Sequence, residues 1–209
     1  MEKELTLQDI LKTIEADLAD PSIISDNKLI FSYDGNTYRT RMPSQLEESI
    51  AQNEKNILFG KLIMTEGYYF KDKLKQILKE KQGVDIDAME YEKTRINMRI
   101  QDAQITLAPK QDDEQKAIET LRSRIIDLQS QRIELSIKIN QYLSCSIEDN
   151  MEKIYIQSLT AHCTEILEVK DDKEVWIKVW KDSKEFQDDS SLLASKAMAY
   201  MSYLVLNVR

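Results

Sequence analysis

Two stretches in the middle of the chain carry apolar side chains at alternating steps of three and four residues. The positions in step are Ile86, Met89, Lys93, Ile96, Ile100, Ala103 and Leu107, and then Ile118, Leu121, Ile125, Leu128, Arg132, Leu135, Ile139 and Tyr142. This is the spacing of a helix that packs on another helix along a seam. Because only Pro109 and a short polar turn separate the stretches, we expect an antiparallel coiled-coil hairpin over residues 86–143.

The hairpin is the candidate partner-binding site. At about 1.5 Å per residue, each arm spans on the order of 30 Å. Apolar residues off the seam, including Ile105, widen the stripe beyond what one partner helix covers, so either the body of the chain or another protein must cover the rest. The predicted binding residues on the seam and its flank are Ile96, Ile100, Leu107, Ile118, Leu121, Ile125, Ile126, Ile133 and Ile137.

The rest of the chain is expected to form a compact, mainly α-helical body from residues 1–85 and 144–209. Only 4 Gly and 3 Pro serve 209 residues, too few for a many-stranded fold. One β-hairpin is predicted at 28–42, where alternating apolar residues flank the turn sequence Asp34-Gly35-Asn36. The run 175–180 is ambiguous between a strand and a short buried helix.

Local signals set the expected helix boundaries. The spacing predicts a first helix over 7–18, a second that starts at Ser44 with Glu47, and a third over 68–81 that ends at Gly83. A helix starting at Ser146 is expected to continue to Ile166. Ser190 or Ser191 is expected to cap a final helix through Leu192, Leu193, Met198, Met201 and Leu204, and the apolar run 197–208 is expected to be a buried helix.

The residues that usually carry catalysis and metal binding are scarce. His162 is the one histidine, and its neighbour Cys163 would point about 100° away from it on a helix. With Cys145, the chain has three Cys and His residues without ligand spacing, which excludes structural zinc in a monomer. No phosphate-binding loop or nucleophile elbow occurs. We expect that the protein is not an enzyme and binds no cofactor or metal. An active site made only of carboxylates, however, would leave no recognisable motif in the sequence.

Charge and hydropathy limit the classes of partner that the chain is expected to bind. The formal net charge of -8 disfavours nucleic acid as a partner. Lysines over 71–81, next to Tyr68, Tyr69 and Phe70, could touch a membrane or RNA, but the helix dipole already favours lysines near a helix C-terminus. No signal peptide is recognised, and the apolar run 197–208 is too short to span a bilayer. We therefore expect a cytoplasmic protein without membrane contact.

The order of elements resembles the assembly proteins of tailed-phage tails, both tail assembly chaperones and small baseplate-hub proteins. The resemblance rests on the hairpin 28–38 that runs through Met42-Pro43-Ser44-Gln45 into a helix, and on Leu159-Thr160-Ala161-His162-Cys163, Asp172 and Val175-Trp176 before a last helix. It covers about two thirds of the chain and carries no residue-level site. It implies a host-cytoplasmic assembly factor, or a part incorporated in the virion, that binds other structural proteins.

The predicted function is therefore that of a non-catalytic structural or assembly protein of a tailed-phage particle, which binds other structural proteins of the same assembly. Whether it also forms a homo-oligomer stays open. The alternative is an acidic inhibitor or decoy that occupies a basic nucleic-acid-binding groove, because acidic residues exceed lysines over 148–191.

Overall fold

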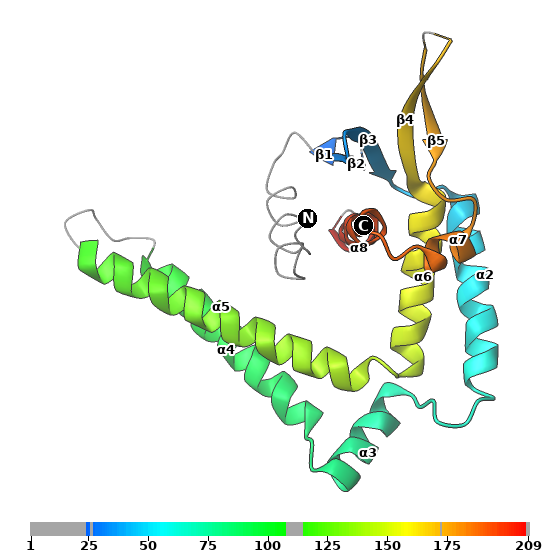
Figure 1. Ribbon diagram of the computed structural model, residues 1–209. Helices are drawn as coiled ribbons and strands as arrows, with labels where there is room; N and C mark the ends of the chain where they lie inside the picture. Colours follow the sequence, from blue (N-terminus) through cyan, green and yellow to red (C-terminus); the bar gives the residue numbers. More distant parts are fainter. Residues whose placement is uncertain (1–23, 26, 108–114, 172, 208–209) are drawn as a thin grey trace, which may run out of the picture. The chain divides into compact units, whose positions relative to one another are not determined.

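The computed structural model describes residues 24–25, 27–107, 115–171 and 173–207, which form a mainly helical protein with a small antiparallel sheet (Figure 1). The predicted fold class is confirmed at this level. The predicted helix over 7–18 lies outside the described residues. The elements are β1 (Ile24–Ser25), β2 (Lys28–Tyr33), β3 (Asn36–Arg41), α2 (Gln45–Leu62), α3 (Lys71–Gln82), α4 (Ile86–Leu107), α5 (Gln115–Leu143), α6 (Ile147–Cys163), β4 (Thr164–Lys170), β5 (Lys173–Lys178), α7 (Ser183–Asp188) and α8 (Leu192–Asn207).

The chain divides into two compact units. Met1–Lys61 and Met151–Arg209 form the first, and Leu62–Asn150 forms the second. The second unit is larger than the predicted hairpin range 86–143, because it also contains α3 and the first residues of α6. The buried residues Leu74 and Leu78 of α3 join a cluster with α4 and α5 residues, which explains why α3 belongs with the helical pair.

The first unit is built on the β2–β3 hairpin, which confirms the prediction at 28–42. Phe31 pairs with Tyr38 across the strands, and both side chains are buried, as the alternating pattern requires. Asp34 and Gly35 have φ angles of 49° and 74° at the turn. Two consecutive positive φ values are those of a type I′ turn, which matches the right-handed twist of the flanking strands.

The sheet is larger than the single predicted hairpin, with strand order β1-β2-β3-β4-β5. The helix expected to continue to Ile166 ends at Cys163, and Ile166 lies in β4 opposite Tyr38 of β3. Residues 175–178 of the ambiguous run belong to β5, which pairs with β4, and Val179 and Trp180 follow the strand. These strands form because long-range pairing with β3 outweighs the weak local helical pattern.

Helix α8 supplies the centre of the first unit. Its Tyr200 and Leu204 are fully buried against β2 and β3, whose Phe31 ring lies 4.7 Å from the Tyr200 ring. Its Met201 belongs to a second cluster, together with Leu159 of α6 and Ala51 of α2. The predicted buried C-terminal helix is thus confirmed over its described side chains, and it packs between the sheet and two helices.

Several predicted helix ends are confirmed by their hydrogen bonds. The Ser44 backbone N–H and hydroxyl donate to Glu47 at 2.9 and 2.8 Å, and the Glu47 N–H donates back to the Ser44 hydroxyl, which is a capping box. Ser146 accepts from the Asp149 N–H and Ser191 from the Ala194 N–H. Gly83 ends α3 with a φ of 69°, the left-handed conformation that glycine adopts readily.

Candidate protein-binding surface

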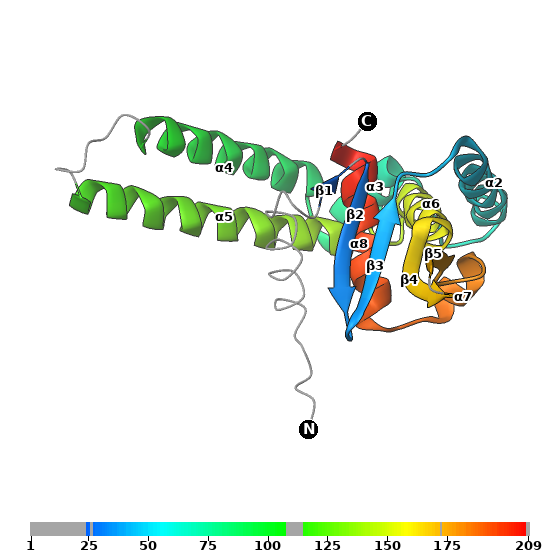
Figure 2. The same cartoon turned by 90° about the horizontal axis from the view of Figure 1, so that it is seen from above.

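The α4 and α5 helices of the second unit lie side by side along the predicted seam (Figure 2). Ile96, Ile100 and Ala103 of α4 are buried with Ile125 and Leu128 of α5. At the other end of the pair, Ile86 at the start of α4 clusters with Ile139 and Leu143 at the end of α5. The two clusters show that the helices run antiparallel, with the seam residues packed on one another.

Most of the predicted binding residues on the seam are therefore inside the pair. Ile96, Ile100, Ile118 and Ile125 are buried, and Leu107 and Leu121 are half-buried. Arg132, which the spacing places on the seam, is exposed. The physical reason is that a guanidinium has a large desolvation cost, so its side chain reaches water instead of the seam.

The predicted flank residues of α5 are the ones that remain accessible. Ile126, Ile133 and Ile137 are 60%, 47% and 48% exposed, and we call them the α5 stripe. Steps of seven and four residues place all three on one face of the helix. Three exposed isoleucines in a row are an unusual feature, because such side chains are normally covered.

A second exposed stripe lies on α4. Tyr91, Met98 and Ile105 recur every seven residues and are all largely exposed, and we call them the α4 stripe. Sequence reasoning singled out Ile105 alone and missed Tyr91 and Met98. The signal that identifies them is the seven-residue repeat, which becomes visible once the seam residues are assigned to the α5 contact.

Three of the five lysines of α3 form ion pairs within the second unit. The Lys71 ammonium lies 2.5 Å from Asp149, Lys75 contacts Asp87 and Glu90, and Lys79 lies 2.7 Å from Asp85. The Lys75 ammonium donates hydrogen bonds to Glu90 and Asp87, and these bonds raise its pKa, the bond to Glu90 more than the bond to Asp87. These pairs neutralise much of the positive charge that a membrane or nucleic-acid surface would need.

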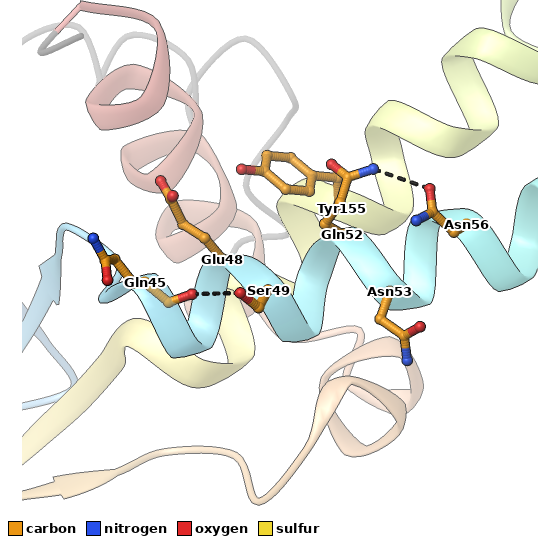
Figure 3. A pocket seen from close by; sticks show the side chains of 7 residues that line it. All are labelled: Gln45, Glu48, Ser49, Gln52, Asn53, Asn56 and Tyr155. Carbon is orange, nitrogen blue, oxygen red and sulfur yellow. Dashed lines mark hydrogen bonds between the residues drawn. The ribbon is translucent and has the colours of Figure 1, made fainter.

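The polar hollow on α2 of the first unit offers little chemistry. Its lining side chains come from α2, together with Tyr155 of α6 (Figure 3). The Gln52 amide donates to Asn56 at 3.0 Å, and the Ser49 hydroxyl donates to the Gln45 carbonyl at 2.8 Å. The lining groups are four amides, the hydroxyls of Ser49 and Tyr155 and one carboxylate, Glu48, and the lining holds no His or Cys, the side chains that most often act as base or nucleophile near neutral pH.

The strongest electrostatic cluster in the first unit is structural. Arg41 makes two parallel hydrogen bonds to Glu47, at 2.9 and 2.7 Å, and a third of 3.2 Å to Glu165 of β4. Arg39 also contacts Glu165 and lies over the Trp176 ring at 4.3 Å. The hydrogen bond from Arg41 is the main cause that lowers the pKa of Glu47 to about 2. The cluster joins β3, β4 and the start of α2.

The two cysteines differ in exposure. Cys163 is fully buried at the end of α6, and burial is the main cause that raises the pKa of its thiol to about 12. Cys145 is exposed in the turn between α5 and α6. Neither thiol has His162 as a hydrogen-bond partner in the described part of the chain.

This difference predicts the outcome of thiol labelling. In native protein, a disulfide reagent such as dithionitrobenzoate should modify Cys145 and leave Cys163 unmodified, because a buried thiol of high pKa supplies almost no thiolate. Two thiols should react per chain in denaturant. The Cys145→Ser variant should show none in native buffer, and rapid labelling of that variant would contradict the burial of Cys163.

The described residues hold neither a metal-binding cluster nor a membrane-spanning helix. No group of three His, Cys, Asp or Glu residues there is placed to hold a metal ion. In the same ranges, no helix combines the length and the apolar character needed to cross a bilayer.

Comparison with known proteins finds no relative. No family model, no curated protein and no solved structure matches the chain. The function must therefore be inferred from the surface itself.

Proposed function

We propose that this chain is a non-catalytic structural or assembly protein that acts through protein–protein contacts on its long helical pair. The observation that carries the proposal is the α5 stripe, a row of exposed isoleucines on a helix whose opposite face is already packed against α4. Fully burying one exposed isoleucine side chain contributes about 1.5–3 kcal/mol, so a partner that covered the three partly exposed side chains of the stripe would gain about 2–5 kcal/mol.

In this proposal, α4 and α5 form an antiparallel coiled coil, and the partner adds a further helix to it. Seven-residue spacing between Ile126 and Ile133 is the spacing that a supercoiled neighbour helix would follow. Asp127 and Glu134 lie along one flank of the stripe, so the matching flank of the partner helix would carry Lys or Arg.

The element order supports a class of partner. It resembles that of tail assembly proteins of tailed phages, so we propose that the partner is another structural protein of such a particle, bound in the host cytoplasm or within the virion. The acidic-decoy alternative is not favoured, because Glu165 and Asp189, two acids of the segment 148–191, already bind Arg39 and Trp180.

The test is co-purification from the native host with identification of the bound protein. We expect wild-type chain to retain a structural protein of the particle, and the Ile133→Asp variant to lose it at least tenfold, since a charge replaces a buried apolar contact. The matched control is Gln131→Asp, an exposed position about 200° around the helix from Ile133.

Two results would end the proposal. One is elution of the chain alone as a monomer when it is expressed with its native neighbours. The other is a bound partner that is retained equally by wild type, Ile133→Asp and Gln131→Asp, because the partner would then occupy another surface.

A further inference from the structure

The α4 stripe is a separate surface with its own geometry. Tyr91, Met98 and Ile105 are 68%, 58% and 71% exposed. At 100° per residue, Met98 lies about 200° around the helix from both Ile96 and Ile100, which pack on α5, so the stripe faces away from α5. A seven-residue repeat drifts by only about 20° per step around a straight helix, so the three side chains form one narrow stripe, the shape that a neighbouring helix covers.

We propose that this helix is α4 of a second copy of the chain, packed antiparallel around a two-fold axis that passes beside Met98. The stripe is symmetric about its centre, because Tyr91 and Ile105 each lie seven residues from Met98. A two-fold axis then places Met98 on Met98 in the central layer. It places Tyr91 on Ile105 of the other copy in each outer layer, which is an isologous interface.

Charges beside the stripe select the antiparallel direction. Arg95 and Asp102 are seven residues apart and lie on the same flank of the stripe, whereas the other flank carries Thr94 and Gln101. In an antiparallel two-fold pair, like flanks face each other. Arg95 lies three residues before Met98, and Asp102 lies four residues after Met98. Because the second helix runs in the opposite direction, Arg95 of one copy then lies beside Asp102 of the other. Symmetry makes two such ion pairs, and a parallel pair would make none.

The monomer leaves these charges available. Arg95 lies 2.9 Å from Glu92, but both side chains are about half exposed, so that ion pair contributes little. Within the described residues, no hydrogen bond or ion pair reaches the Asp102 carboxylate; only its backbone carbonyl accepts a bond, from the Thr106 hydroxyl. Both groups can therefore turn toward a second copy without breaking a strong contact.

The α5 stripe does not share this self-complementarity. Its flank carries Asp127 and Glu134, and an antiparallel pairing of two α5 helices would place these acids opposite each other. Like charges across an interface disfavour pairing. The two stripes thus have different occupants, a second copy on α4 and another protein on α5, and the self-association goes beyond the proposed function.

The size of the interface sets the expected affinity. A single pair of 22-residue helices with three apolar layers is smaller than a standard protein interface. We therefore expect a dissociation constant on the order of micromolar and a mass that depends on concentration.

The first experiment is sedimentation velocity on the full chain between about 1 and about 100 µM, a range that brackets a micromolar equilibrium. The mass should rise from 24.4 kDa toward twice that value. Met98→Lys should weaken dimerisation at least about thirtyfold, because two ammonium groups would meet at the axis. Ile126→Lys, the same change on the α5 stripe, should leave dimerisation unchanged. Unaltered thermal unfolding of both variants shows that these exposed substitutions preserve the fold.

The second experiment tests the direction of the helices. Arg95→Asp and Asp102→Arg should each weaken the dimer about three- to tenfold, and the double variant should restore it, because the swap recreates both ion pairs in the antiparallel register. A chain that stays monomeric at the highest concentration overturns the proposal. A dimer that tolerates Met98→Lys, or a double variant no tighter than the single ones, overturns it as well.

Discussion

Ile125→Asp is expected to unfold the helical unit, with a loss of about 4 kcal/mol or more in the free energy of unfolding. Ile125 is 8% exposed and belongs to the cluster that joins α4 to α5. The substitution removes its apolar contacts and places a carboxylate among the apolar side chains of this cluster. Urea titration followed by circular dichroism measures the loss, and hydrogen exchange should locate it in α4 and α5.

The next residue in the chain provides the matched control. Ile126 carries the same side chain but is 60% exposed, so Ile126→Asp should change the unfolding free energy by no more than about 0.5 kcal/mol. The two variants have identical composition and charge, so any difference between them reports burial alone. Equal destabilisation by the two substitutions would contradict the assignment of the seam.

Arg41→Ala is expected to lower the free energy of unfolding of the first unit by about 3 kcal/mol. The side chains of Glu47 and Glu165 are only 10% and 11% exposed, and Arg41 binds both. Removing one partner of such a cluster leaves a carboxylate poorly compensated, which is more costly than the ion pair was favourable. Arg39→Ala should lower the free energy of unfolding by less, because Glu165 then still has Arg41 as its ion-pair partner. Chemical denaturation of both variants measures the difference, and equal losses would contradict the shared role of Arg41.

The same cluster predicts a dependence of stability on pH. The pKa of Glu47 is lowered from 4.5 to about 2 in the folded protein, so the unfolded chain binds the proton first as the pH falls. The stabilisation is complete above about pH 4.5 and is lost as the pH falls toward 2, with an upper value of about 3 kcal/mol. The Glu47→Gln variant has no carboxylate to protonate at this position, so its free energy of unfolding should fall less steeply than that of wild type between about pH 4.5 and 2. If the unfolding free energies of Glu47→Gln and wild type fall in parallel over this pH range, the lowered pKa of Glu47 is not the cause of the acid sensitivity.

Much of the fold is predictable because it depends on local signals. The Asp34-Gly35 turn, the Ser44 and Glu47 capping box and the Gly83 helix end each need only a few adjacent residues. Strand β4 could not be predicted in that way. Its residues carry a pattern that also suits a helix, and the contact that makes them a strand is with β3, far away in the sequence.

The candidate surface was predictable in part for a related reason. Spacing places Ile125 and Ile126 on different faces, and it correctly indicates that some isoleucines must lie off the seam. Spacing does not distinguish the residues that are buried between α4 and α5 from those that stay exposed on the surface, because both sets are apolar. Tyr91 and Met98 were missed because single apolar residues on a polar face are common on protein surfaces.

The sheet of the first unit is completed by strands from the two ends of the chain. Arg39 of β3 and Glu165 of β4 are 126 positions apart, and the whole of Leu62–Asn150 lies between them. On the ribosome, β4 therefore emerges roughly ten seconds after β3, at ordinary rates of elongation. The helical unit, with its local contacts, can fold during that interval and shorten the loop that must close. Until then, the nascent polypeptide carries an open strand edge, and slow translation would prolong its exposure to aggregation.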